Sequence, residues 1–174
     1  DTLVRFGEAV FDPIVEVLTG SRREMQRYWA ARVLSQLQTP RAVSPLVATL
    51  SDHSSKVRAE AAHALGNLGL HEAVASLSDL LLEDPVSLVR DAAAEALGKI
   101  ADDRALAALT EALRDVDYAA RRKAMEALEK VGERAIPYFM EALQSDSKEA
   151  CAQAASALER LGKVEKEIER LGTS

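Results

Sequence analysis

The stretch that decides the fold is Val-Arg-Ala-Glu-Ala-Ala-His-Ala-Leu-Gly at residues 57–66, which returns as Val-Arg-Asp-Ala-Ala-Ala-Glu-Ala-Leu-Gly at residues 89–98. In both copies, small and apolar residues recur at helical spacing. The leucine of the pattern recurs about every 31 residues, a period typical of helical repeat arrays, in which helix pairs stack to bury their apolar faces. These anchor leucines are Leu3, Leu34, Leu65, Leu97, Leu128 and Leu158.

The period predicts an all-α fold: a right-handed α-α superhelix, or solenoid, of five helix pairs plus a C-terminal capping helix, in a single domain. The expected pairs cover residues 8–40, 41–71, 72–103, 104–133 and 134–162. Residues 1–7 match the last turn of a second helix and predict the end of a truncated repeat, and residues 163–174 predict the cap. Pro13, Pro45 and Pro137 favour helix starts at first helices, because a proline in the first turn loses no hydrogen bond.

Composition limits the classes of partner. The 174 residues carry a formal net charge of −6 with both signs mixed along the chain, which disfavours a broad phosphate-binding face and therefore nucleic acid. No apolar stretch approaches the ~20 residues of a membrane span, and the N-terminus lacks a secretory pattern. With one cysteine, Cys151, interpreted as an inert packing residue, the expectation is a cytoplasmic protein without membrane insertion.

A repeated charge spacing predicts contacts between repeats. An aspartate precedes an aligned arginine by six residues in three places: Asp52 and Arg58, Asp84 and Arg90, and Asp115 and Arg121. Arginine forks held by carboxylates of the same and the adjacent repeat would form a structural ladder with no catalytic role. The ladder is expected to fade at both ends, where the matching positions hold Ser21 with Arg27 and Ser145 with Cys151.

The motif Val-Arg-x-x-Ala-Ala-x-Ala-Leu-Gly, with Asp52 or Asp84 ahead of it, resembles HEAT repeats of the shorter type named after phycobilisome lyases. The resemblance covers residues 3–162. It implies that the second helices line a concave face and the first helices a convex one. It is specific for fold and not for function, because proteins of this type include scaffolds, lyase subunits and enzyme appendages.

The enzymatic alternatives have little support in the residues. The resemblance brings in deoxyhypusine hydroxylase, whose several His-Glu pairs hold two irons, but this chain has one such pair, His71-Glu72, so no metal, cofactor or catalytic residue is predicted. A bilin lyase-type, chromophore-handling subunit stays open as the alternative function, although one tryptophan, three tyrosines and three phenylalanines offer few rings for a tetrapyrrole. Nucleic-acid binding, known for some HEAT-like proteins, conflicts with the net charge.

The main functional hypothesis is a non-catalytic scaffold that binds another protein along its concave face. Positions projecting from the second helices vary in chemistry while the leucine and alanine positions do not. Trp29 is interpreted as a packed lid in preference to an exposed anchor. The sequence does not decide the partner's identity or the binding face. For the exposed N-terminal edge two alternatives remain: the chain is a fragment of a longer polypeptide, or it self-associates through this edge. The predicted partner-binding residues are Tyr28, Trp29, Arg32, His63, Glu95, Lys99, Glu126 and Lys130.

Overall fold

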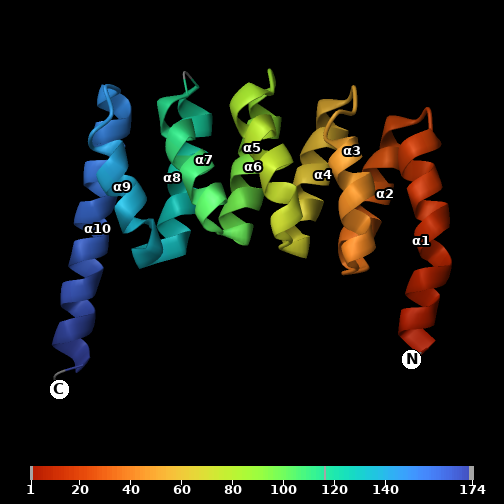
Figure 1. Cartoon of the computed structure of the whole chain (residues 1–174), viewed down its shortest axis with the longest axis horizontal. Helices are drawn as coiled ribbons and strands as arrows, with labels where there is room; N and C mark the ends of the chain where they lie inside the picture. The colour runs from red at the N-terminus through yellow and green to blue at the C-terminus, as the bar shows by residue number, and fades with distance from the viewer. Residues whose placement is uncertain (1, 116, 173–174) are drawn as a thin grey trace.

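The structure is a computed structural model that describes the backbone of residues 2–115 and 117–172 and the side chains of residues 9–115 and 117–162. Over these residues helix is the only regular secondary structure, which confirms the all-α prediction. The helix pairs follow one another along the long axis of the molecule (Figure 1). They are α1 (Thr2–Gly20) with α2 (Glu24–Gln36), α3 (Val43–Thr49) with α4 (Ser55–Leu68), α5 (Val74–Glu83) with α6 (Ser87–Ile100), α7 (Asp103–Glu111) with α8 (Tyr118–Val131), and α9 (Ile136–Ala142) with α10 (Lys148–Gly172). Short 3-10 helices cover Pro40–Ala42, His71–Ala73, Ala112–Arg114 and Gly132–Ala135.

The anchor leucines lie in the interior of the array. Leu34, Leu65, Leu97 and Leu128 have no exposed surface, and Leu158 is partly buried against the same core. The side chain of Leu3 lies outside the described residues. Many of the other core positions hold alanine, and such small side chains let the helices approach closely.

The second helices form the more tightly packed layer. Contacts of α4 with α6 and of α6 with α8 are far more extensive than those of α5 with α7 or α7 with α9. Two glycines permit this closeness: a Cβ placed on Gly66 would lie 2.6 Å from the Cα of Ala96, and one on Gly98 would lie 2.8 Å from the Cβ of Ala127. A curved array needs its tighter layer on the inner side, so this packing suits second helices on a concave face.

An arginine ladder joins successive repeats along the turns that precede the second helices. In each rung the guanidinium donates from Nη1 to the backbone oxygen of the residue six positions earlier. In the rung of Arg58, Nε and Nη2 also face a single carboxylate of the next repeat. For Arg58 these distances are 2.8 Å to the Asp52 oxygen, and 2.7 and 3.0 Å to the two Asp84 carboxylate oxygens. Such bidentate, charge-assisted pairs fix both distance and orientation.

The rungs of Arg90 and Arg121 share the backbone contact and differ in their side-chain contacts. Arg90 donates to the Asp84 backbone oxygen at 2.8 Å, and its Nε and Nη2 lie 3.1 and 2.9 Å from carboxylate oxygens of Asp115 and Asp117. Arg121 donates to the Asp115 backbone oxygen at 2.7 Å. The three aspartates at positions six residues before an arginine therefore act twice, through the backbone toward their own repeat and through the carboxylate toward the preceding one.

The N-terminal end of the ladder differs from the sequence expectation. Arg27 is nearly buried and donates to the Ser21 backbone oxygen at 2.9 Å and to Asp52 at 2.6 and 2.9 Å, so the rung is complete without an aspartate at position 21. The reason is that the residue six positions earlier contributes its backbone oxygen, which any residue carries. At the other end, Cys151 takes the arginine position, and its Sγ lies 3.1 Å from the Ser145 backbone oxygen.

Both ends of the chain also depart from the predicted boundaries. The sequence predicts a separate final turn in residues 1–7, but α1 runs without a break from Thr2 to Gly20, so Pro13 lies in its interior and not near its start. The comparable helix α8 ends before Gly132, which takes a φ of 74°, whereas α1 continues through Gly7. The expected cap at residues 163–174 continues α10 to Gly172, and residues 1, 173 and 174 lie outside the described residues.

Over the described helices, none combines the length and the apolar character that crossing a membrane requires.

Candidate functional site

The exposed sides of α2, α4, α6 and α8 form one surface, which we call the second-helix face. Its N-terminal end carries the aromatic cluster that the sequence singles out. The rings of Tyr28 and Trp29 meet edge to face with centroids 5.4 Å apart, and the Arg32 guanidinium lies 5.3 Å from the Trp29 ring centroid. Trp29 is 51% exposed, so the lid interpretation is wrong and the ring is held by its neighbours at the surface.

Around this tryptophan lies an apolar patch made by Met25, Tyr28, Trp29 and Leu88. Met25 and Leu88 are 53% and 51% exposed, and the four side chains border an open hollow of about 510 Å³ that His63 also lines. Clustered exposed apolar side chains of this kind are uncommon on soluble surfaces and mark interaction sites. Large side chains from three helices contribute, so the patch depends on the stacking of the repeats.

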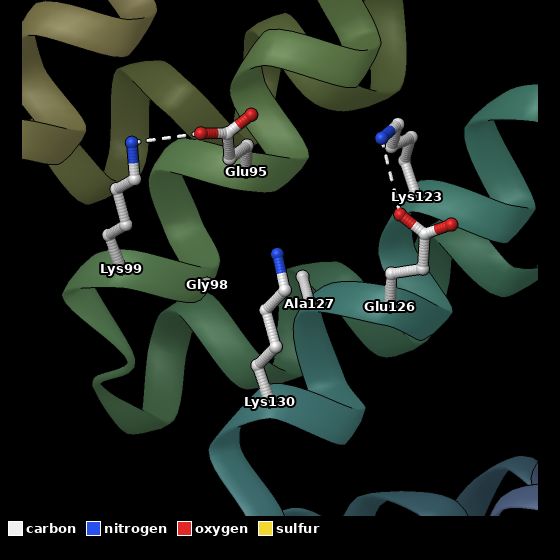
Figure 2. A pocket seen from close by; sticks show the side chains of 7 residues that line it. All are labelled: Glu95, Gly98, Lys99, Lys123, Glu126, Ala127 and Lys130. Carbon is white, nitrogen blue, oxygen red and sulfur yellow. Dashed lines mark hydrogen bonds and ion pairs between the residues drawn. The ribbon is translucent and has the colours of Figure 1, made fainter.

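A second feature, the charged pocket, lies between α6 and α8 (Figure 2). It is a smaller cavity of about 170 Å³. The Lys99 ammonium pairs with Glu95 at 2.9 Å on one side, and the Lys123 ammonium pairs with Glu126 at 3.2 Å on the other. Figure 2 shows the Lys130 side chain rising between these two pairs. The lining residues are Glu95, Gly98, Lys99, Lys123, Glu126, Ala127 and Lys130.

The ion pairs keep both carboxylates of the pocket charged. The hydrogen bond from Lys99 lowers the pKa of Glu95, and the hydrogen bond from Lys123 lowers the pKa of Glu126. Lys130 differs from the other two lysines, because within the described part of the chain no hydrogen bond or ion pair reaches its ammonium group. The pocket therefore holds two ion pairs and one further cation, Lys130, which acts on Glu95 only through its charge at longer range.

One half-buried carboxylate lies beside this surface. Burial raises the pKa of Asp91, and its buried Oδ1 has no hydrogen-bond partner, although Lys123 and Arg122 are close enough to favour its charged form. Arg122 itself pairs with Glu126. The charge of Asp91 thus offsets part of the positive charge on α8.

The structure brings the predicted residues together in two groups. Tyr28, Trp29 and His63 border the apolar patch, with Arg32 beside Trp29. The other predicted residues, Glu95, Lys99, Glu126 and Lys130, all line the charged pocket. His63 and Glu95 connect the groups, since the Nδ1 of His63 on α4 lies 4.0 Å from a carboxylate oxygen of Glu95 on α6.

Sequence reasoning missed Met25, Leu88 and Lys123. Met25 and Leu88 occupy the same position in their repeats. Large apolar residues at a repeat position that faces solvent were a signal available in the alignment of the repeats. Lys123 occupies the same repeat position as Trp29. Its place in the pocket depends on the spacing of α6 and α8, which the sequence does not give.

The described residues offer little for catalysis on this face. No group of three or more His, Cys, Asp or Glu side chains among them is placed to hold a metal ion. His71, of the one His-Glu pair, lies in the turn between repeats with its Nδ1 3.2 Å from an Asp102 carboxylate oxygen. The arrangement is suited to noncovalent binding through one apolar and one charged area.

Comparisons with known proteins agree with this architecture. A family model described as HEAT repeats matches residues 11–98 and 89–159. No curated protein sequence matches the chain significantly. Among solved structures, a chain in the complex of CpcE and CpcF of phycocyanin lyase from Nostoc sp. PCC7120 is similar, with 29% identity and a TM-score of 0.65. The match covers 88% of the present chain and 65% of the chain in the complex.

Two further structures show how widely the fold is shared. An engineered protein is 25% identical, with a TM-score of 0.53 over 87% of this chain and 78% of that one. Human deoxyhypusine hydroxylase is 23% identical, with a TM-score of 0.51 over 90% of this chain and 75% of that one, a likeness that shows the fold alone.

Proposed function

Because the chain belongs to the HEAT repeat family, we propose that it is a protein-binding subunit that holds a partner protein on its second-helix face. The observation that carries the proposal is the presence of the apolar patch and the charged pocket on this one face. Repeat arrays of this kind use extended surfaces for binding. A protein partner of the array is also in keeping with the similar lyase structure, in which two subunits form a complex.

The apolar patch supplies the expected anchor of the interface. Trp29 combines a large apolar surface with a position fixed by Tyr28 and Arg32, and tryptophan, tyrosine and arginine are the residue types that most often carry binding energy. A side chain that is already held in place loses little conformational freedom on binding. The charged pocket would add register and selectivity through complementary charge.

Replacing Trp29 with Ala is expected to weaken partner binding by about 30-fold or more, as for an interface hot spot, with helicity unchanged. The partner is first recovered on the immobilised chain from extract of the source cells, identified by mass spectrometry and purified. Affinity is then measured by calorimetry and helicity by circular dichroism. Met140→Ala is the matched control, because Met140 is 50% exposed on α9, a first helix. Equal affinities of the two variants would move the binding site off the second-helix face.

A second candidate function is a subunit of a lyase-type complex that handles an open-chain tetrapyrrole on a carrier protein. The 29% identity to the phycocyanin lyase structure over 88% of the chain favours it more directly than it favours a plain scaffold. In this case the partner protein would be a second lyase subunit, and the exposed Trp29 ring would contact the pigment's rings.

Biliverdin serves as the probe for this second candidate. On titration into the chain together with its recovered partner, a lyase-type subunit should give a saturable change in the visible absorbance, weakened by Trp29→Ala but not by Met140→Ala. An unchanged spectrum of biliverdin in the presence of the intact pair would leave only the protein-binding function.

A further inference from the structure

We infer that the segment bound by the second-helix face carries an apolar anchor and, along from it, acidic side chains. This inference rests on the proposed function and names the chemistry of the partner's binding segment. The anchor occupies the apolar patch, and the carboxylates occupy the charged pocket and the adjoining side of α8.

The lining of the charged pocket departs from the charge of the whole molecule. The chain has a net charge of −6, yet three lysines of the lining, Lys99, Lys123 and Lys130, stand against two carboxylates, Glu95 and Glu126. An acidic segment is repelled by most of the protein surface and attracted here, so the local excess of cations directs it to this part of the face.

The contacts inside the charged pocket select an anion over a cation. Both open carboxylates, Glu95 and Glu126, already accept hydrogen bonds from lysines, so an incoming cation would have to displace an existing pair. The Lys130 ammonium has no partner among the described residues and lies between the two pairs (Figure 2). An incoming carboxylate would therefore form a new ion pair with Lys130 and break none.

The floor of the pocket leaves room for such a group. Gly98 and Ala127 are packed tightly together at its base, and the cavity of about 170 Å³ lies above them, with the long charged side chains around it. A carboxylate on a flexible stem, as in glutamate or aspartate, can enter between the lysines with its stem against Ala127.

The spacing of the two areas defines the length of the bound segment. The patch begins on α2 and the pocket ends on α8, three helix-to-helix steps of about 10 Å each. An extended segment crossing the helices would need about nine residues for this distance. The expected pattern is one or two large apolar residues separated by a short stretch from one or more acidic residues.

The test selects peptides from a phage-displayed random library of about 12 residues, long enough to span both areas. Selection uses the immobilised full chain, and the selected peptides are synthesised with a fluorescent label and measured by anisotropy. We expect peptides that combine Trp, Phe or Leu with Asp or Glu and contain few Lys or Arg. Their affinity should fall with added salt and should fall about ten-fold or more in Lys130→Glu, with a smaller loss in Lys130→Gln.

Arg134→Glu is the matched control, since Arg134 is an exposed cation in the turn before α9, away from the pocket. Three outcomes would each overturn the inference. The selected peptides could be basic or uncharged, no peptide could be selected, or peptide affinity could fall equally in Lys130→Glu and Arg134→Glu. The proposed function stands apart from these outcomes, because a partner whose affinity falls in Trp29→Ala is held on this face whatever the charge of its segment.

Discussion

Replacing Arg58 with Ala is expected to lower the free energy of unfolding by roughly 3–5 kcal/mol, the cost of removing one member of a buried ion pair. The side chains of Arg58 and Asp84 are only 13% and 4% exposed, so the variant would leave the Asp84 carboxylate in the interior with just the backbone N–H of Val86 to bind. The Asp52 backbone oxygen would also lose its donor. Urea unfolding followed by circular dichroism measures the change.

Arg134→Ala is the control for this experiment. Arg134 is 62% exposed and lies 3.5 Å from a still more exposed carboxylate of Asp103, an arrangement worth at most about 1 kcal/mol. Similar losses in the two variants would mean that the ladder adds nothing beyond ordinary surface pairs. If the ladder acts as described, Arg58→Ala combined with Asp84→Ala should be more stable than the sum of the single losses predicts.

Gly66→Ala is expected to destabilise the fold by about 1–3 kcal/mol or more, although alanine is the better helix former. The added methyl carbon would lie 2.6 Å from the Cα and 2.8 Å from the Cβ of Ala96. Since the nearest atom belongs to the backbone of α6, no side-chain rotation relieves the overlap, and α4 and α6 must move apart.

Gly20→Ala provides the comparison, because nothing lies within 4 Å of a Cβ at Gly20 in the last turn of α1. There the exchange should leave stability unchanged or raise it slightly by restricting the unfolded chain. Thermal unfolding of both variants measures the difference. A Gly66→Ala protein as stable as Gly20→Ala would show that α4 and α6 can separate freely at this point.

The sequence predicted the fold well because its information is repeated. Each anchor leucine and each aspartate-to-arginine spacing occurs several times, so the period identifies helix pairs even where a single copy is ambiguous. The ends are predicted less well, since a segment at an end has a neighbour on one side only. The continuous α1 and α10 show this: local residues, with no repeat to compare, decide whether a turn forms.

The candidate site was predicted in part, for a different reason. Alignment of the repeats shows which positions share the second-helix face, and Trp29, Glu95 and Lys130 were found in this way. The alignment does not show how far apart neighbouring helices lie or which lysine pairs with which glutamate. The exposure of Trp29 and the lack of a partner at Lys130 depend on those distances, and only the structure supplies them.

The arginine ladder also has an evolutionary consequence. An internal repeat presents a carboxylate to the arginine of the preceding repeat and a guanidinium to an aspartate of the next one. Excision of residues 53–84 would leave Asp52 six positions ahead of Arg90, with Arg27 still facing Asp52, so the joint would be chemically complete. Such an array can lengthen or shorten by whole units through duplication or deletion within the gene without orphaning a buried charge, and its binding face can change in reach while every joint stays the same.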